Sequence, residues 1–477
     1  MIKRAENKHP ILQLVLFSLL IFAILFLDIF GLGTATDNAS RQAFLKIIAP
    51  FHTVSARDAR DKIVVITISD TDLPTLANKP GHQWPLDYAD QADLLAVIIE
   101  TNPKVIFWDF FIPEINERDT GFSKLESLLR ATVAAGTPKL IFADALQGIN
   151  SPPAETKAAK DTHANRIITV APQIAATGVT ISPSSWRSEA YRYPLYINTQ
   201  TLDPATTETG LHVKPSAATE IYRILNPDNA KSSGSPMTVI WGNDTAPSYS
   251  EEEEKAHNCP AATSAWGIPG YIAQAFSGPK NINSSWLQPN PCFFHNHYSA
   301  KRFLNLYNGM DPSTDIFSAL EGKAVFVGGN IAAIPDMYVS PINGPVPAVM
   351  LHAAALDNLL TYKNEYPREP KRHKWLSLEI DIAEITEITF MLFALIFSAK
   401  AREKRSYILA HPYAKLLYLA ALLTGFIVLF VMILIMFYSY NNIVPVNWVV
   451  LLSISLMAVA PKSQTVTNAC AAFLRLR

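Results

Sequence analysis

Four apolar segments constrain the fold of this 477-residue chain more than any other feature, because they lie at its two ends. A helix needs about 20 apolar residues to cross the hydrocarbon core of a bilayer. The sequence therefore predicts one transmembrane helix near the N-terminus and three near the C-terminus, with a large polar region between them. The four predicted helices cover residues 11–30, 375–398, 416–438 and 443–460.

The charges beside these segments predict their orientation. Lys3, Arg4 and Lys8 precede the first segment, and no small-residue cleavage motif follows it, which indicates an uncleaved signal anchor. A cleaved signal peptide is the alternative. Residues 1–10, the basic loop 399–415 and the basic tail 461–477 are expected on the cytoplasmic side. Four crossings then leave residues 31–374 extracytoplasmic.

Composition excludes some classes of protein. The 40 basic and 41 acidic residues create no global positive field for nucleic acid. Neither a zinc-type cysteine spacing nor a Walker loop is present. Cys259 and Cys292 fall in the region predicted to be extracytoplasmic, where disulfides persist, so they are a candidate bridge. We expect neither a metal nor a cofactor.

Apolar runs and amphipathic stretches alternate through the first part of the large region. Alternation of this kind predicts a mostly parallel sheet with helices packed on it, the α/β class. Residues 145–320 are rich in Pro, Ser, Thr, Ala and Asn, and they are predicted to be a large loop-rich insertion. The expected strands are 63–69, 104–110, 139–143 and a late strand 323–327, and the expected helices are 88–101, 122–135 and 351–360.

Asp70, Asp109 and Asp144 lie at or just beyond the ends of predicted parallel strands. Ligands bind at this edge of open α/β sheets. An apolar strand followed by Asp70-Thr71-Asp72 is also how some phosphohydrolases present a nucleophile, but no late acidic pair or phosphate-neutralising lysine is evident. Caps and turn hydrogen bonds are the simpler interpretation of these carboxylates, and ligand binding is the other.

Several motifs together resemble the bacterial CHASE type 2 sensor domain. They are the strand ending in Asp70, the Trp84-Pro85 pair, VIFWDFFIPE at 105–114, AVFVGGN at 324–330 with Asp336 after it, and VMLHAAALDNLL at 349–360. The layout of one anchor, a large domain and three closely spaced helices is similar too. Where the family often shows an arginine after Trp-Pro, this chain has Leu86-Asp87-Tyr88, which puts binding of an anionic ligand in doubt.

The resemblance implies a bacterial inner-membrane, multi-pass protein whose large domain senses something on the extracytoplasmic side. The residues at the expected ligand-binding edge are Asp70, Asp72, Trp84, Asp109, Asp336 and His352. Family members usually continue into a cytoplasmic kinase or cyclase module. Here only residues 461–477 follow the last predicted helix, so we expect the output to lie on another chain.

Three carboxylates in the second predicted span, Asp381, Glu384 and Glu387, would fall within an arc of about 120° on a helix. Carboxylates are costly inside a bilayer, so they face a partner, a cavity or water. A helix projecting above the membrane, a contact with a basic partner helix and an ion path are the three interpretations. Separately, His295 and His297 would share a face of a strand and could bind a metal, although no third ligand is evident.

The sequence thus predicts a non-enzymatic membrane receptor subunit that binds a ligand or protein outside and acts through its helices on a partner. The expected partners are the lipid bilayer and another membrane or periplasmic protein, in a homo- or hetero-oligomer. The alternative is a structural or docking subunit of a membrane-bound assembly. A less favoured third hypothesis is an Asp-based phosphohydrolase.

Overall fold

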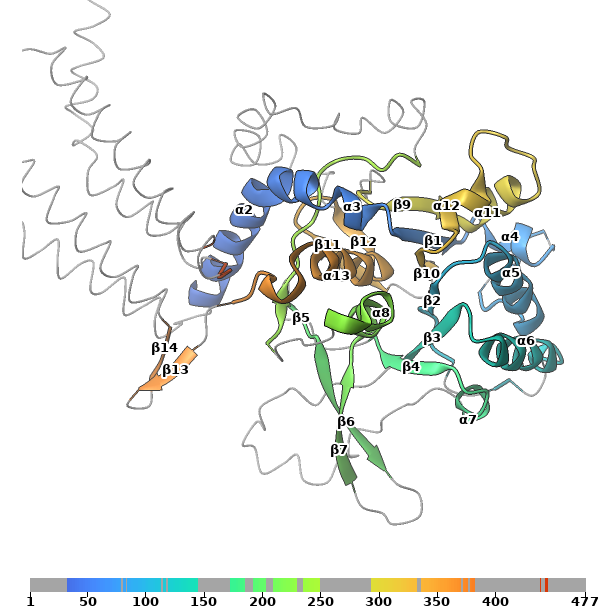
Figure 1. The fold of residues 1–477 in the computed structure, drawn as a ribbon, viewed down its shortest axis with the longest axis horizontal. Helices are drawn as coiled ribbons and strands as arrows, with labels where there is room; N and C mark the ends of the chain where they lie inside the picture. The colour runs from blue at the N-terminus through green and yellow to red at the C-terminus, as the bar shows by residue number, and fades with distance from the viewer. Residues whose placement is uncertain are drawn as a thin grey trace, which may run out of the picture. The chain divides into compact units, whose positions relative to one another are not determined.

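The computed structural model divides the chain into two compact units, residues 1–44 with 367–477 and residues 45–366 (Figure 1). Among the residues described, no helix has the length and hydropathy that a bilayer crossing requires. The first predicted span lies wholly outside the described residues, and so do the third and fourth except at residues 438 and 443–444. The structure describes residues 32–78, 80–82, 84–112, 115–116, 119–144, 172–184, 192–202, 209–229, 235–248, 293–332, 336–369, 372–375, 378–381, 438 and 442–444.

A six-stranded sheet organises residues 45–366, and every adjacent pair of its strands is parallel. The strand order is β4-β3-β2-β10-β1-β9. This confirms the predicted α/β class with a mostly parallel sheet. The strands are β1 (Ile63–Ser69), β2 (Val105–Trp108), β3 (Lys139–Asp144), β4 (Thr180–Pro183), β9 (Asn296–Ser299) and β10 (Ala324–Asn330).

The late strand β10 lies at the centre of the sheet, between β1 and β2. Ala324 pairs with Ile63 on one side and with Val105 on the other. The apolar residues of these three strands are buried on both faces, as expected for strands covered by helices on each side. The prediction that the late strand completes the sheet is therefore confirmed.

Helices cover both faces of the sheet (Figure 1). Side chains alternate along β1, so that Val64, Ile66 and Ile68 enter one core while Ile63 and Val65 enter the other. The first core is closed by α4 (Leu73–Leu76), α5 (Tyr88–Glu100), α6 (Phe122–Ala135), α11 (Ala300–Tyr307) and α12 (Ile316–Leu320). The second is closed by α8 (Ala217–Leu225) and α13 (Val349–Tyr362).

The expectation that residues 145–320 form a separate loop-rich insertion is wrong in part. Both edge strands, β4 and β9, come from this region, and so do the core helices α8 and α11. Short, partly polar strands carry too little periodicity to be recognised. The same region also supplies α7 (Pro172–Ala175), η3 (Pro227–Asn229) and the antiparallel pairs β5 (Arg192–Tyr193) with β8 (Met237–Thr238) and β6 (Tyr196–Leu202) with β7 (Thr209–Pro215).

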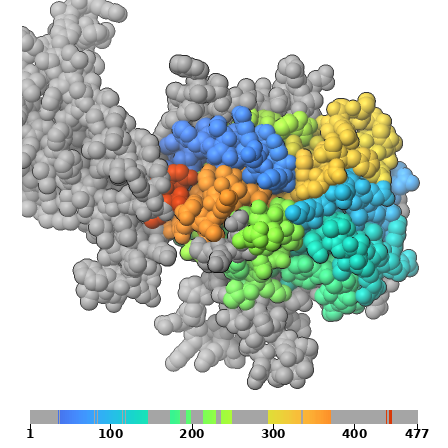
Figure 2. Space-filling view, in the orientation of Figure 1, coloured from blue at the N-terminus to red at the C-terminus, as the bar shows by residue number. Residues whose placement is uncertain are grey.

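Short elements flank α13 in the chain. The hairpin of β11 (Met337–Ser340) and β12 (Gly344–Pro347) precedes that helix, and η4 (Lys363–Glu365) follows it. At the other end of the unit, α2 (Leu32–Ser55) and α3 (Arg57–Arg60) lead into β1. Figure 2 shows the N-terminal residues in blue lying directly beside the late residues in orange, in agreement with the contact between α3 and α13.

The start of the second predicted span is corrected by the structure. Strands β13 (Arg372–Trp375) and β14 (Leu378–Asp381) form an antiparallel pair, so a helix does not begin at Trp375. The register places Arg372 opposite Asp381 and Trp375 opposite Leu378. Asp381 therefore does not share a helix face with Glu384 and Glu387, both of which lie outside the described residues.

A glycine sets the distance between α13 and the sheet. A methyl group added at Gly328 on β10 would lie 2.5 Å from Cβ of Val349, the first residue of α13. Both atoms belong to buried backbone or to a short, stiff side chain, so neither can move aside cheaply. Only glycine allows this helix to start so close to the central strand.

We predict that Gly328→Ala lowers the free energy of unfolding by about 1–3 kcal/mol, because the added methyl overpacks this contact. Val349→Gly removes the Cβ and both methyl groups that the added methyl would meet, so the double variant should be more stable than the sum of the two single losses implies. Chemical denaturation of the wild type, both single variants and the double variant measures this coupling. Additive losses would contradict the assigned contact.

Candidate functional site

A group of titratable side chains meets at the carboxyl end of the sheet. Asp109 directly follows β2, and its backbone N–H still donates to Val327 O of β10 at 2.8 Å. His352 lies in the first turns of α13, with Nε2 4.0 Å from Asp109 Oδ2. Asp336 precedes the β11–β12 hairpin and is close enough to influence the charge of Asp109. The strand ends and the start of α13 thus assemble these three residues.

The imidazole of His352 has a defined set of partners. Its Nδ1 lies 2.8 Å from the Tyr193 hydroxyl, which accepts a hydrogen bond from Ala218 N at 3.1 Å. Burial lowers the pKa of His352 to about 3, so the ring is neutral at physiological pH. A neutral ring that accepts from Tyr193 at Nδ1 carries its proton on Nε2, the atom that faces Asp109.

The carboxyl groups at this edge are energetically unfavourable as anions. Burial raises the pKa of Asp109 well above its usual range, the nearby charge of Asp336 raises it further, and a hydrogen bond from Ser184 opposes both effects. Partial desolvation also raises the pKa of Asp336, which is exposed at the surface. One buried and one exposed carboxyl beside a neutral imidazole can bind a proton, a cation or a ligand that donates hydrogen bonds.

Asp144 belongs to the same edge but has a different electrostatic environment. It ends β3 and is buried, with Oδ2 3.9 Å from Lys214 Nζ on β7. The ammonium group offsets part of the cost of burying the carboxylate. Asp144 therefore has a cation from within the domain, whereas none of the described salt bridges of Asp109 involves lysine or arginine.

Asp70 and Asp72 lie on the other side of the central strand β10, after β1. Asp72 is buried and accepts hydrogen bonds from Ser69 N at 2.7 Å, Ser69 Oγ at 2.6 Å and Lys301 N at 3.2 Å. Its carboxylate shapes the turn before α4, the structural role that the sequence left open. Asp70 is exposed and accepts from Ala332 N at 3.0 Å. Neither residue is brought to His352.

Trp84 is partly buried on the α5 and α6 side of the sheet. Its ring stacks on Phe110 with 4.8 Å between centroids, and it packs against the first core, to which Phe110 belongs. Phe110 follows Asp109 directly, so Trp84 supports the strand end from the face opposite His352. Asp87 directly precedes α5. It lies in the stretch after Trp84-Pro85 where the family often has an arginine.

The two histidines around Asn296 do not form a pair. Strand β9 begins at Asn296, so the side-chain alternation that would align His295 with His297 does not extend to His295. His297 Nε2 lies 2.8 Å from Thr67 Oγ1, whereas His295 Nε2 lies 3.6 Å from Asp357 Oδ2. Within the part of the chain that the structure describes, no group of three or more His, Cys, Asp or Glu side chains has metal-binding geometry.

Sequence reasoning missed Tyr193 and Ser184, the partners of His352 and Asp109. Both lie in residues 145–320, where no periodicity or motif distinguished them. It also missed the contact between His52 and Asp357, which are 305 residues apart. The candidate bridge between Cys259 and Cys292 lies outside the described residues.

The fold and this edge define an α/β domain built on a parallel sheet. The CHASE2 domain family matches residues 16–397, most of the chain. The protein therefore belongs to the CHASE2 domain family, a family of sensor domains, and the resemblance seen in the sequence is confirmed. Comparisons with curated proteins and with solved structures found no significant match.

We predict that Asp109→Asn stabilises the domain, and that the gain grows as pH rises. An aspartate whose pKa is raised in the folded state contributes stability at low pH and loses it as pH rises through the folded pKa. Asparagine has no charge to desolvate. Between pH 5 and pH 8, the unfolding temperature of Asp109→Asn should exceed that of the wild type by a growing margin. Each kcal/mol of added stability corresponds to about 2–4 °C.

The matched control is Asp70→Asn, at the same edge but with an exposed carboxylate. Its effect on the unfolding temperature should be small at every pH. If Asp109→Asn were less stable than the wild type at pH 8, Asp109 would be a structural anion and not an unfavourable one.

Proposed function

We propose that this protein is a non-enzymatic membrane sensor subunit whose extracytoplasmic domain binds a ligand at the carboxyl end of its parallel sheet. One observation carries the proposal: the buried carboxyl of Asp109 lies beside His352 at that edge, and the exposed Asp336 is close enough to raise the pKa of Asp109. Open α/β sheets bind ligands at this edge. Membership of a sensor-domain family supports the same role.

The energetic argument is that the domain retains an unfavourable group of charges. The buried Asp109 carboxyl, whose pKa is raised, reduces the stability of the folded state at neutral pH. Perturbed groups of this kind cluster at functional sites, because a bound ligand can repay their cost. A ligand with a cationic or hydrogen-bond-donating group would be stabilised by the same two carboxyls.

The membrane part of the proposal rests on the sequence. Four apolar segments flank the domain, and basic residues mark residues 1–10, 399–415 and 461–477 as cytoplasmic. A multi-pass arrangement in a bacterial inner membrane follows, with the domain in the periplasm. In this proposal the bound state is passed to another membrane or periplasmic protein in a homo- or hetero-oligomer.

We predict that a small-molecule panel, tested by thermal shift on the full chain in nanodiscs, contains a class that raises the unfolding temperature. In Asp336→Asn, the ligand concentration that gives half of the maximal shift should rise about tenfold, equivalent to about 1.4 kcal/mol of binding. Asp93→Asn, a change on the exposed surface of α5, is the control and should keep the shift. Stoichiometric co-purification of a protein, with no ligand that shifts stability, would favour a docking subunit instead.

The orientation can be tested by cysteine labelling in intact cells. Ser318 is exposed on α12, so Ser318→Cys should react with a membrane-impermeant maleimide when Cys259 and Cys292 are replaced by serine. Cys470 should react only after the membrane is permeabilised. Equal labelling of Cys470 in intact cells would contradict the proposed orientation.

A further inference from the structure

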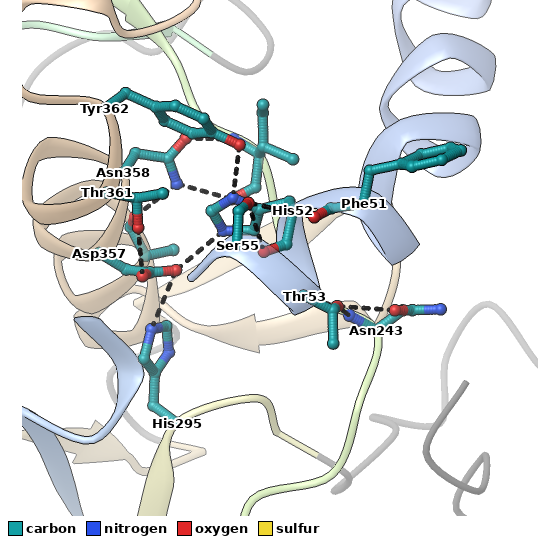
Figure 3. Close-up of polar contacts among 12 residues, drawn as sticks. Phe51, His52, Thr53, Ser55, Asn243, His295, Asp357, Asn358, Thr361 and Tyr362 are labelled. Atoms are coloured by element: carbon teal, nitrogen blue, oxygen red, sulfur yellow. Dashed lines mark hydrogen bonds and ion pairs between the residues drawn. The ribbon is translucent and has the colours of Figure 1, made fainter. Parts of the chain in front are cut away.

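Two histidines from separate segments converge on one buried carboxylate in the domain, on the side of α13 away from the proposed ligand edge. His52 lies on α2, His295 lies just before β9, and Asp357 lies in the middle of α13 (Figure 3). His52 Nε2 is 2.9 Å from Asp357 Oδ2, and His295 Nε2 is 3.6 Å from the same oxygen. Three elements are therefore joined at one atom.

The carboxylate has no permanent cation beside it. The side chain of Asp357 is 1% exposed, those of His52 and His295 are 0% and 5% exposed, and Asp357 forms no ion pair with lysine or arginine among the described residues. Burial raises the pKa of Asp357, but the charge and hydrogen bond of His52 and the nearby imidazole of His295 lower it by more. The positive charge that balances Asp357 must come from an imidazole.

The groups around the three residues are compatible with a change of proton number. The Tyr362 hydroxyl lies 2.9 Å from His52 Nδ1, and it can donate to a neutral ring or accept from a charged one. Thr361 Oγ1 donates to Asp357 Oδ1 at 3.4 Å. On the other side, Phe294 packs against both imidazoles and separates them from Arg60.

Another cation near this site, Arg60 of α3, is paired with other carboxylates. Its guanidinium lies over the Phe294 ring at 5.4 Å, donates to Asp61 Oδ1 at 3.2 Å and approaches Asp244 to 4.0 Å. These ion pairs leave the charge of Asp357 to be balanced by histidine. One proton shared by the two imidazoles makes the buried group neutral. A second proton leaves a net positive charge in an environment that solvates it poorly.

We propose that His52, His295 and Asp357 form a proton-operated latch that holds the C-terminal half of α2 against α13. The latch is closed when the two histidines carry one proton together, and it is open when each carries one. Histidine is the side chain whose charge ordinarily changes between pH 5 and 8, so mild acid is the signal. This inference goes beyond ligand binding at the sheet edge and does not depend on it.

The position of α2 in the chain gives the latch a consequence. The helix directly follows the first predicted transmembrane segment, and its residues 45–55 belong to the same compact unit as α13. Opening the latch weakens the attachment of these residues, which then depends on the two hydrogen bonds between Thr53 and Asn243, while the sheet stays intact. Acidification on the outer side would thus change the link between the domain and the N-terminal segment without unfolding the domain.

Hydrogen exchange of the full chain in nanodiscs tests the latch. After correction for the intrinsic rate, amides of residues 45–55 should exchange about tenfold faster at pH 5.5 than at pH 7.5, which is a loss of about 1.4 kcal/mol of protection. Peptides of β1 provide the internal reference and should not change. A flat response of α2 in the wild type, or an equal increase in β1, would overturn the proposal.

Variants separate the two-histidine mechanism from other effects of acid. His295→Gln keeps a hydrogen-bond donor but cannot take the second proton, so the pH response of residues 45–55 should disappear. His52→Gln should also remove it, which provides a second variant if one fails to fold. His82→Gln, in a loop outside the latch, is the control and should respond like the wild type. Persistence of the response in both latch variants would show that another group is responsible.

Discussion

The burial of α13 on all sides is the constraint on which the rest of the domain depends. Every residue from Val349 to Leu359 is buried, including three that are polar, and each polar residue must find a partner inside the protein. Asn358 pairs with both backbone groups of Ile240, at 3.0 Å and 2.7 Å. His352 and Asp357 bind side chains from two other segments. The helix thereby fastens distant parts of the chain to the central strands.

The same helix separates two polar groups of different character. At its start, His352 is neutral and faces a carboxyl whose charge is disfavoured by burial. In its middle, Asp357 is held as an anion by two imidazoles. The difference follows from the number of hydrogen bonds and cations that reach each carboxyl. At the sheet edge the cost of burying the Asp109 carboxyl is not offset by a cation among the described residues, which favours binding of a ligand. A carboxylate shared by two histidines instead favours a response to protons.

The hydrophobic pattern was enough to predict the repeated strand and helix units, because apolar runs and amphipathic periods are local properties. Strand β1 and helix α6 have the predicted bounds, and the family resemblance rested on motifs around them. The pattern failed at β4 and β9, which have only four residues each. It also failed at Trp375, where apolar and acidic residues suggested a helix and the chain forms a strand pair.

By itself, the sequence determined the α/β class, the family and the presence of carboxylates at the ends of parallel strands. Only the tertiary structure decided which carboxylates meet. The position of β10 between β1 and β2 separates Asp70 and Asp72 from Asp109, and the close approach of α13 at Gly328 brings His352 to Asp109. The contact of His52 with Asp357 joins residues 305 positions apart. Contacts between distant residues depend on strand order and packing, which local patterns do not encode.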